Sequence, residues 1–392
     1  MISSAILVAP LLIAQAQTVE VPFTLTDHAI VVDSVVNGKP VSTMFDTGFS
    51  GSYILSDTLN LGKSTGSITL QDFVGTFQAE TVKVNSVKVG AKTLAPGDMT
   101  IIKQRGSDYS ASYGVHCDGL MGLEVFANEI FQINFEHSKF VFYPKTHDLT
   151  KIALKSEKCR LLKMLPIGNN SIVLAVEAPT GKKMYLALDT GNGFYATTHK
   201  DVLERIGMWK VGAKPTFTSG AWVASGPVDT FNLRLKNLNI YGIPVEESVW
   251  SIIDLPSSSA EGDGTVGFGF LKNFNVTIDM ERRLVLLENF TGKLSDPEMA
   301  HVGLRAVYNG RTQRMFIFDV TPNSPAAKAG IREGDNLISV NGEFVRNISP
   351  DKLDDMLKGP AGTTVQLATS RDNLLSRHEL ERVPLINDPV MP

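Results

Sequence analysis

The chain contains the same short motif twice, each time at the end of an apolar run. The first copy is Met44-Phe45-Asp46-Thr47-Gly48, and the second is Ala187-Leu188-Asp189-Thr190-Gly191. A carboxylate at the end of a buried strand costs free energy unless another group compensates for it. Two such carboxylates in contact would share one proton, because two like charges do not both ionise easily there. We therefore expect Asp46 and Asp189 to face each other and to activate a water molecule.

The spacing around the two motifs is also repeated. The interval along the chain from Asp46 to Gly122 is almost the same as the interval from Asp189 to Gly267. A duplication that keeps its spacing this closely predicts two similar halves. Each half would present one carboxylate, and the two would meet across a pseudo-two-fold axis.

Runs of β-branched and apolar residues, separated by turn residues such as Asn37-Gly38, predict a mainly β protein. We predict two duplicated β-rich lobes, followed by a smaller α+β domain. The predicted segments are a signal peptide at 1–16, an N-terminal lobe at 17–150, a C-terminal lobe at 151–292 and the last domain at 299–387.

The first sixteen residues have the pattern of a secretory signal. Residues 5–14 form an apolar run, and Ala14-Gln15-Ala16 is a small-x-small cleavage site. The run is shorter than the roughly 20 residues of a spanning helix, and no later run is long and apolar enough to span. We expect an exported protein with no integral membrane span in the mature chain; an uncleaved apolar anchor is the alternative.

The net charge of −4 over 392 residues gives no electrostatic basis for binding nucleic acid or an anionic membrane surface. Cys117 and Cys159 could pair in an oxidising compartment or stay free. Neither has the paired Cys or His spacing of a zinc site, so no metal is expected. The expected partner is a peptide or protein substrate, and no cofactor is expected.

In this context the two motifs resemble those of aspartic proteases of the retropepsin and pepsin type. Each follows an apolar strand and is matched later by an Asp-Gly-x-x-Gly segment, which ends at Gly122 or Gly267. The resemblance covers residues 20–290 and implies that the two lobes have duplicated β-barrel folds. It implies that one ionised aspartate acts as a general base on water while its protonated partner stabilises the oxyanion. The residues it assigns are Asp46 and Asp189 as the catalytic pair, with Thr47, Gly48, Thr190 and Gly191 supporting their loops.

The chain departs from the family pattern directly after each Asp-Thr-Gly motif. Family members carry Ser, Thr or Ala there, whereas this chain has Phe49 and Asn192. A missing hydroxyl removes a hydrogen bond to a carboxylate and favours a higher pKa for the pair. A second hypothesis is therefore a catalytically degenerate peptide-binding or scaffold protein. A third is a fold that works only as a dimer, although two halves in one chain predict an active monomer.

Family members close hairpins over the substrate, and the resemblance implies two such flaps here. Gly75 and Gly220 follow Asp46 and Asp189 at closely similar intervals along the chain. Aromatic residues near these glycines would form apolar walls for peptide side chains or belong to the ordinary core. These residues are Phe73, Phe77, Phe217 and Trp222.

The last part of the chain resembles a PDZ domain of the bacterial protease-associated kind. The match is Ser-Pro-Ala-Ala-Lys-Ala-Gly-Ile-Arg-Glu-Gly-Asp at 324–335, followed by Leu-Ile-Ser-Val-Asn-Gly at 337–342. The resemblance implies that a peptide adds to a sheet edge and that its carboxylate is held by backbone N–H groups. The loop implied for the carboxylate is Val302, Gly303, Leu304 and Arg305. A purely structural module packed on the peptidase is the alternative.

Overall fold

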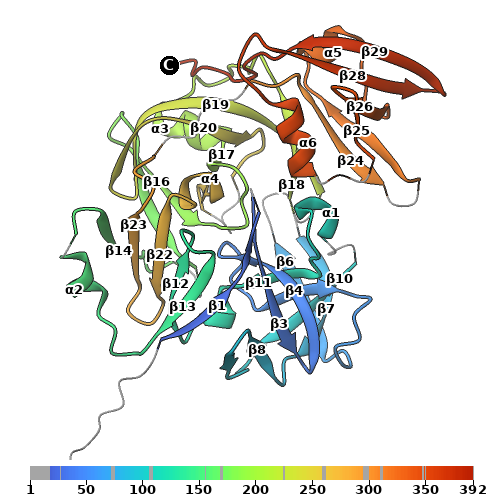
Figure 1. Cartoon of the computed structure of the whole chain (residues 1–392). Coiled ribbons are helices and arrows are strands. Elements are labelled where there is room, and N and C mark those ends of the chain that lie inside the picture. Colours follow the sequence, from blue (N-terminus) through green and yellow to red (C-terminus); the bar gives the residue numbers. More distant parts are fainter. Residues whose placement is uncertain are drawn as a thin grey trace, which may run out of the picture.

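The structure is a computed structural model, and it describes residues 18–26, 28–71, 76–105, 109–154, 156–167, 171–223, 226–257, 262–294, 300–309, 312–346, 348 and 350–391. Its described residues are mainly β, with two sheet-based lobes and a separate C-terminal domain at the upper right of Figure 1. The predicted fold class, a two-lobed mainly β protein with an additional C-terminal domain, is confirmed.

The N-terminal lobe, or N-lobe, is built on a ten-stranded sheet in the described part of the chain. Its path is β6-β7-β10-β5-β11-β4-β3-β8-β9, and β2 pairs with β3. The strands are β2 (Thr24–Leu25), β3 (Ile30–Val36), β4 (Lys39–Asp46), β5 (Tyr53–Ser56), β6 (Gly66–Gln71), β7 (Thr76–Lys83), β8 (Val87–Val89), β9 (Lys92–Leu94), β10 (Thr100–Gln104) and β11 (Gly119–Gly122). Helix α1 (Ser110–Tyr113) and the 3-10 helix η1 (Leu123–Phe126) flank β11.

The C-terminal lobe, or C-lobe, has a seven-stranded sheet in the described residues, in the order β15-β16-β21-β17-β20-β19-β18. The strands are β15 (Val173–Glu177), β16 (Lys183–Leu188), β17 (Ala196–His199), β18 (Ser219–Val223), β19 (Gly226–Ile240), β20 (Ile243–Ile253) and β21 (Gly264–Val266). Its helices are α3 (Lys200–Ile206) and α4 (Phe268–Leu271).

The two lobe sheets repeat one topology. Read from β18, the C-lobe order matches the N-lobe order from β6 to β3, strand for strand. In each lobe the strand that leads to the motif aspartate, β4 or β16, runs parallel to a short strand, β11 or β21. That short strand also pairs antiparallel with β5 or β17. Each motif aspartate is therefore delivered by the same arrangement of three strands.

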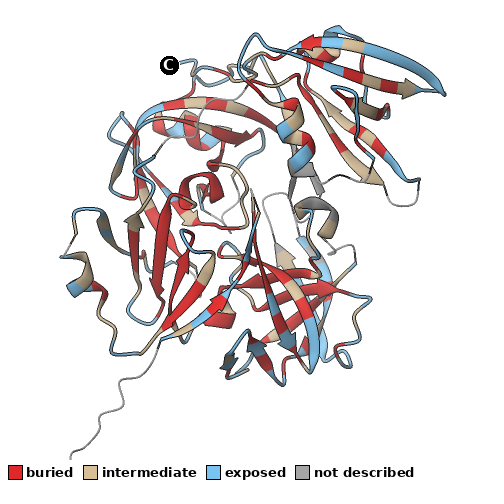
Figure 2. Ribbon diagram, in the orientation of Figure 1, coloured by how far each residue is buried: buried red, intermediate tan, exposed pale blue. Residues whose placement is uncertain are grey.

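A third sheet joins the two halves, because β12 of the first half pairs with β22 of the second. Its strands are β1 (Val19–Pro22), β12 (Ile130–Asn134), β13 (Lys139–Tyr143), β14 (Cys159–Lys163), β22 (Phe274–Asp279) and β23 (Leu284–Asn289), and helix α2 (Leu149–Ala153) precedes β14. Buried residues follow these strands into the centre of the molecule (Figure 2). Phe45, which precedes Asp46, packs against Phe126 and Phe140 at ring-centroid distances of 5.2 and 5.0 Å. These aromatic contacts hold the end of β4, and with it the N-lobe motif, in place.

The C-terminal domain has its own sheet and its own hydrophobic core. Its elements are β24 (Leu304–Asn309), β25 (Arg314–Val320), α5 (Pro325–Lys328), β26 (Asn336–Val340), β27 (Glu343–Phe344), α6 (Pro350–Leu357), β28 (Thr364–Arg371) and β29 (Leu374–Glu381). Strand β24 forms one edge of the sheet path, and α6 lies against it. Asp335 is buried and accepts hydrogen bonds from the Arg371 guanidinium at 2.6 and 2.7 Å, which ties the turn before β26 to β28.

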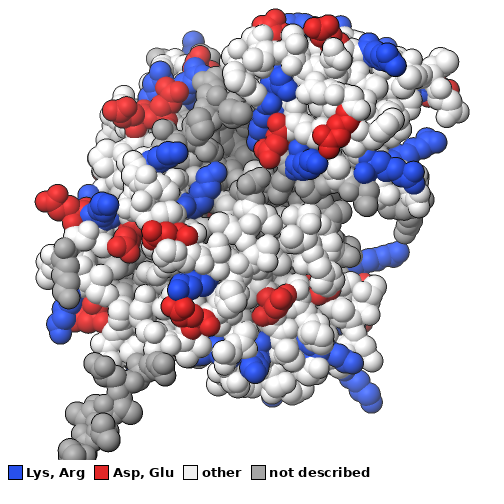
Figure 3. Space-filling model, viewed as in Figure 1, with Lys and Arg blue, Asp and Glu red and all other residues white. Residues whose placement is uncertain are grey.

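The C-terminal domain contacts both lobes. Helix α6 lies against α1 of the N-lobe, and β25 lies against β18 of the C-lobe (Figure 1). Positive and negative side chains are interspersed over the face shown in Figure 3. Among the described residues, no helix is both long enough and apolar enough to cross a membrane.

Candidate active site

Asp46 and Asp189 lie together at equivalent positions in the two lobes. Asp46 is the last residue of β4, where it pairs in register with Gly122 of β11. Asp189 follows β16, and its amide donates to the carbonyl of Val266 at 3.0 Å. The two carboxyl groups are hydrogen-bonded to each other. The structure thus brings together the pair that the repeated motif predicts.

The threonines of the two motifs interlock the loops. Thr47 Oγ1 donates to the carbonyl of Leu188 at 2.8 Å and accepts from the amide of Thr190 at 2.9 Å. Thr190 Oγ1 donates to the carbonyl of Phe45 at 2.7 Å and accepts from the amide of Thr47 at 3.1 Å. All four hydrogen bonds are buried, so breaking one would leave a polar group unpaired away from water. The exchange fixes the two loops relative to each other.

The glycines of the motifs allow the two carboxyl groups to approach. A Cβ on Gly48 would lie 2.6 Å from Cγ of Asp189, and a Cβ on Gly191 would lie 2.5 Å from Cγ of Asp46. Both distances are shorter than any tolerable contact, so only glycine leaves the space that the opposite side chain occupies. Gly48 and Gly191 therefore each leave room for the aspartate of the opposite lobe.

Each carboxylate also accepts two backbone amides from its own loop. The donors are Gly48 at 2.8 Å and Phe49 at 3.2 Å for Asp46, and Gly191 at 2.9 Å and Asn192 at 3.1 Å for Asp189. Backbone N–H groups favour the ionised form of a carboxyl group. Both loops thus stabilise a negatively charged carboxylate, although two ionised carboxylates this close would repel each other.

Thr265 makes the pair asymmetric. Its hydroxyl is hydrogen-bonded to Asp189, and its Oγ1 accepts from Asn192 Nδ2 at 2.7 Å. The strand registers place Leu120 at the equivalent position in the N-lobe. A leucine offers no hydroxyl, so Asp189 has a hydrogen-bond donor of a kind that the equivalent position does not supply to Asp46. In the sequence, Thr265 is one of the two variable residues of the Asp-Gly-x-x-Gly segment that ends at Gly267.

The electrostatics of the pair follow from burial and proximity. Burial raises the pKa of Asp46 well above its ordinary value, and the charge of Asp189 raises it further. Burial also raises the pKa of Asp189, but hydrogen bonds from Asp46, Gly191 and Thr265 oppose that rise. The two carboxyl groups therefore bind and release protons as a pair. The Thr265 hydroxyl favours the negative charge on Asp189 rather than on Asp46.

Phe49 is accommodated beside the acid pair. A Cβ on Gly51 would lie 2.5 Å from Phe49 Cζ, and a Cβ on Gly122 would lie 2.6 Å from Phe49 Cδ1, so two glycines make room for the ring. Phe49 joins a small apolar cluster that also includes Leu70 and Tyr109. Burial raises the pKa of Tyr109 to about 12, and the nearby charge of Asp46 adds to this rise. Tyr109, which precedes α1, is a residue near the acid pair that no sequence motif indicated.

The predicted flap residues are placed only in part. Phe73 and Gly75 lie outside the described residues. Phe77 belongs to β7, and Gly220 and Trp222 belong to β18, where Gly220 pairs with Asp229. Phe217 is half-buried just before β18. Strands β6 and β18 occupy equivalent edges of the two lobe sheets. That the predicted flap residues cover the substrate remains a prediction.

The predicted carboxylate loop of the C-terminal domain is a tight turn. Val302 and Leu304 are buried in the domain core, and Gly303 has a φ of +81° that favours glycine. The Gly303 amide donates to His301 Nδ1 at 2.9 Å, so this donor is already engaged. Burial lowers the pKa of Arg305, although neighbouring carboxylates oppose that change. Peptide binding by this loop remains a prediction.

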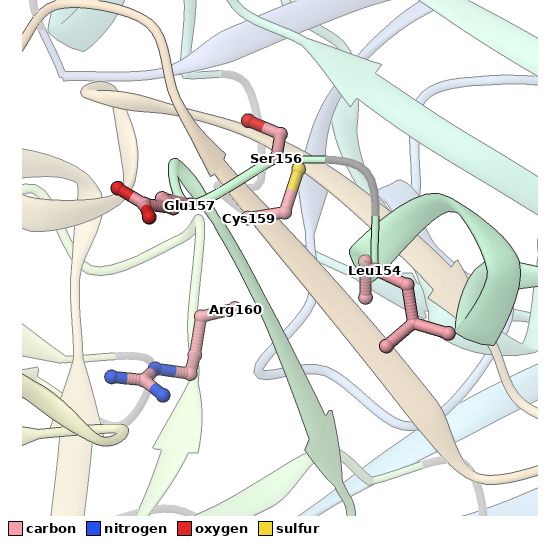
Figure 4. Close-up of a pocket in the computed structure, with 6 residues that line it drawn as sticks. Leu154, Ser156, Glu157, Cys159 and Arg160 are labelled. Atoms are coloured by element: carbon pink, nitrogen blue, oxygen red, sulfur yellow. The ribbon is translucent and has the colours of Figure 1, made fainter.

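A surface pocket of about 500 Å³ lies away from these sites, beside α2 and the start of β14 (Figure 4). Cys159 and Arg160 belong to its lining. Burial raises the pKa of the Cys159 thiol, which makes it a poor nucleophile. The Arg160 guanidinium donates to the carbonyl of Gly242 at 2.8 Å. Cys117 and Cys159 are both free thiols, so the two cysteines do not pair.

Comparisons with known proteins identify the C-terminal domain. Residues 293–370 match the family model of the PDZ domain, which confirms that part of the prediction. The chain is 32% identical over 79 residues to carboxyl-terminal-processing peptidase 3 of Arabidopsis thaliana chloroplasts. It is 36% identical over 80 residues to tight junction protein ZO-3 of Mus musculus. Each match covers 20% of this chain, and they cover 15% and 9% of those proteins, respectively.

Among solved structures, the chain is similar to an aspartic proteinase from Irpex lacteus, with 14% sequence identity and a TM-score of 0.46. That similarity covers 71% of this chain and all of the other. The curated relatives differ from one another in kind, and the chain spans a small share of their length. The two lobes are therefore characterised by their own strand pairing and by the geometry of the acid pair.

Proposed function

We propose that this protein is an aspartic endopeptidase that hydrolyses peptide bonds in extended segments, with Asp46 and Asp189 as its catalytic pair. The observation that carries the proposal is the reciprocal enclosure of the two carboxyl groups. Each is hydrogen-bonded to the other and fits against the glycine of the opposite motif. Interlocked threonines hold this contact in place. Enclosed carboxyl groups that share one proton provide an acid and a base in the same site.

In the proposed reaction, ionised Asp189 takes a proton from water as the water oxygen attacks the peptide carbonyl carbon. Asp46 donates its proton to the carbonyl oxygen, and a neutral tetrahedral diol forms. Asp189 then gives its proton to the leaving nitrogen as the C–N bond breaks, and a diol hydroxyl returns a proton to Asp46. This sequence needs one proton on the pair at the start and restores it at the end.

The PDZ domain supports a peptide or protein substrate. PDZ domains bind extended peptides along a sheet edge, and β24 forms such an edge beside α6. We propose that the domain binds the substrate or another peptide while the lobes carry out hydrolysis. The chain carries both acid groups, so we propose an active monomer without a cofactor.

The proposal is tested by digesting a peptide library across pH with the wild-type protein and with Asp189→Asn. The expected result is cleavage by the wild type with an acidic optimum, and cleavage by the variant that is slower by orders of magnitude. Equal cleavage by both proteins would refute the assignment. Tight binding of a pepstatin-type transition-state mimic would argue against the alternative of a degenerate scaffold.

Thr265 is expected to set the acidic limit of activity. Thr265→Val removes a hydroxyl donor that stabilises ionised Asp189, so the Asp189 pKa should rise and the acidic limb should move up by about one pH unit. Thr265→Ser keeps the hydroxyl and should leave the limb in place. The alkaline limb reflects loss of the shared proton. Burial raises the pKa of Asp46, so this loss should occur above the ordinary carboxyl range. A pH–rate profile with the same acidic limb for Thr265→Val and wild type would contradict this role.

We also propose that the protein is exported, on the basis of the apolar run at residues 5–14 and the cleavage pattern at Ala14-Gln15-Ala16. These residues lie outside the described part of the structure. Amino-terminal sequencing of protein recovered outside the cytoplasm should begin at Gln17. Recovery of the full-length chain from the cytoplasm would contradict export.

A further inference from the structure

The chain returns from the PDZ domain to the C-lobe after its last strand. Val383 pairs with His301 at the start of the domain. Leu385 then reaches the predicted carboxylate loop, where a Cβ on Gly303 would lie 2.9 Å from Leu385 Cδ1. Beyond this point the segment crosses over β19, as its red trace shows near the C-terminus in Figure 1.

Asn387 anchors this segment on the C-lobe. The residue is 5% exposed, and its side-chain amide group is paired on both sides. The side-chain oxygen accepts from the amides of Thr216 at 2.7 Å and Phe217 at 3.0 Å, and the side-chain nitrogen donates to the carbonyls of Phe217 at 2.9 Å and Asn232 at 3.0 Å. An asparagine side chain has two donors and one acceptor oxygen, so this environment uses its full capacity.

The backbone of the same segment continues the attachment. The Asn387 amide donates to the carbonyl of Asn232 at 2.9 Å, and its carbonyl accepts from the amide of Arg234 at 2.9 Å. The amide of Lys210 donates to the carbonyl of Val390 at 2.6 Å. An isolated parallel β-bridge between Leu233 and Asn387 thus holds the backbone beside the buried side chain.

The residues that Asn387 binds lie next to β18. Thr216 and Phe217 lie just before that strand, which is the C-lobe counterpart of β6 in the sheet order. Strand β18 also contacts β25 of the PDZ domain. The C-lobe hairpin β18–β19 is therefore attached to the PDZ domain in two ways, by direct contact and through the C-terminal segment.

We propose that residues 384–391 form a latch that fixes the C-lobe hairpin and the PDZ domain to each other, with Asn387 as its positioning residue. The PDZ domain then contributes to the wall of the substrate site as well as binding peptide. The effect on substrate depends on the proposed peptidase function, whereas the attachment itself does not.

Hydrogen exchange on the full chain tests the latch without reference to activity. Asn387→Ala removes the acceptor for the Thr216 and Phe217 amides, so exchange across 214–223 should accelerate by about tenfold or more. Strand β22 should be unaffected, which shows that the core remains folded. Asn387→Asp keeps the acceptor but places a charged oxygen against the Phe217 and Asn232 carbonyls, so it should accelerate exchange at least as much as Asn387→Ala. Unchanged exchange at 214–223 in Asn387→Ala would overturn the latch.

Asp388→Asn is the matched control. The Asp388 side chain is 71% exposed and pairs with Arg234 at 2.9 Å. A pair this exposed contributes little to stability, so exchange at 214–223 should stay within about twofold of wild type. An increase as large as that of Asn387→Ala would show that the surface charge, rather than the buried amide, holds the segment.

Peptide kinetics test the positioning role. Asn387→Ala should raise KM about three- to tenfold and leave kcat within about twofold, because the acid pair is untouched and binding alone is weakened. Faster exchange with an unchanged KM would overturn the role in substrate binding. A wild-type protein that cleaves no peptide would refute the proposed function, while the exchange experiment would still decide on the latch.

Discussion

Replacing Asp189 by Asn is expected to lower the rate of peptide hydrolysis by roughly 10²–10⁴-fold, the usual contribution of a general base. The amide oxygen of Asn can still accept from the Gly191 and Asn192 amides, which bind Asp189 at 2.9 and 3.1 Å. The loop should therefore keep its shape while losing the group that takes a proton from water. Cleavage of a denatured protein, followed over time at several pH values, measures the effect.

Asp57→Asn is the control for this experiment. Asp57 is exposed near the end of β5, and its replacement makes the same chemical change outside the acid pair. This variant should cleave like wild type. Near-wild-type activity in Asp189→Asn, with activity lost in Asp57→Asn, would place the catalytic carboxylate elsewhere.

Replacing Gly191 by Ala is expected to separate the two carboxyl groups. The new Cβ would lie 2.5 Å from Cγ of Asp46 and 2.6 Å from its Oδ1, so either that side chain or the loop must move. Insertion of a methyl group into a packed site costs about 1–3 kcal/mol of unfolding free energy. A displacement near 1 Å at reacting groups costs about 100-fold in rate. Activity should thus fall far more than the loss of stability explains, as denaturant unfolding and peptide kinetics together would show.

Gly66→Ala provides a matched change in β6. Its Cβ would lie 3.5 Å from Thr81 Oγ1, which is ordinary contact. This variant should keep wild-type activity and stability. If Gly191→Ala behaves in the same way, the two loops do not enclose each other's carboxyl groups as described.

The protonation of the pair also links stability to pH. The folded-state pKa values of Asp46 and Asp189 are raised above their ordinary values, chiefly by burial. The pair therefore favours the folded state most at low pH, below the ordinary carboxyl pKa, where both groups are protonated in the folded and the unfolded chain. That contribution is lost as pH rises through the raised folded pKa values. This acidic preference agrees with the pH range in which one shared proton remains on the pair.

The repeated motif was enough to predict the pairing of Asp46 and Asp189, because both residues end strands of matching pattern. The family resemblance implied that Thr47 and Thr190 support the loops, although only the structure shows that each threonine bonds to the opposite loop. Phe49 is larger than the Ser, Thr or Ala found at this position in the resembled family. Glycines at 51 and 122 make room for its ring, and their spatial relation to Phe49 is not visible in the sequence.

Two features depend on long-range contacts that local patterns do not encode. Thr265 reaches Asp189 because β21 runs beside β16, and its only sequence signal is a hydroxyl where the N-lobe repeat has Leu120. Asn387 binds Thr216 and Phe217, although the whole PDZ domain lies between them in the sequence. A short segment after a domain, such as residues 383–391, gives no local sign of such an attachment. The tips of the predicted flaps, at Phe73 and Gly75, lie outside the described residues.

The most direct test of the shared-proton site is calorimetric titration of the full chain with a pepstatin-type inhibitor, whose hydroxyl mimics the tetrahedral diol. We predict one inhibitor bound per monomeric chain, with affinity that weakens as pH rises through loss of the shared proton and that largely disappears in Asp189→Asn. Equal affinity for Asp189→Asn and wild type at every pH, or one inhibitor per two chains, would contradict an acid pair completed within a single chain.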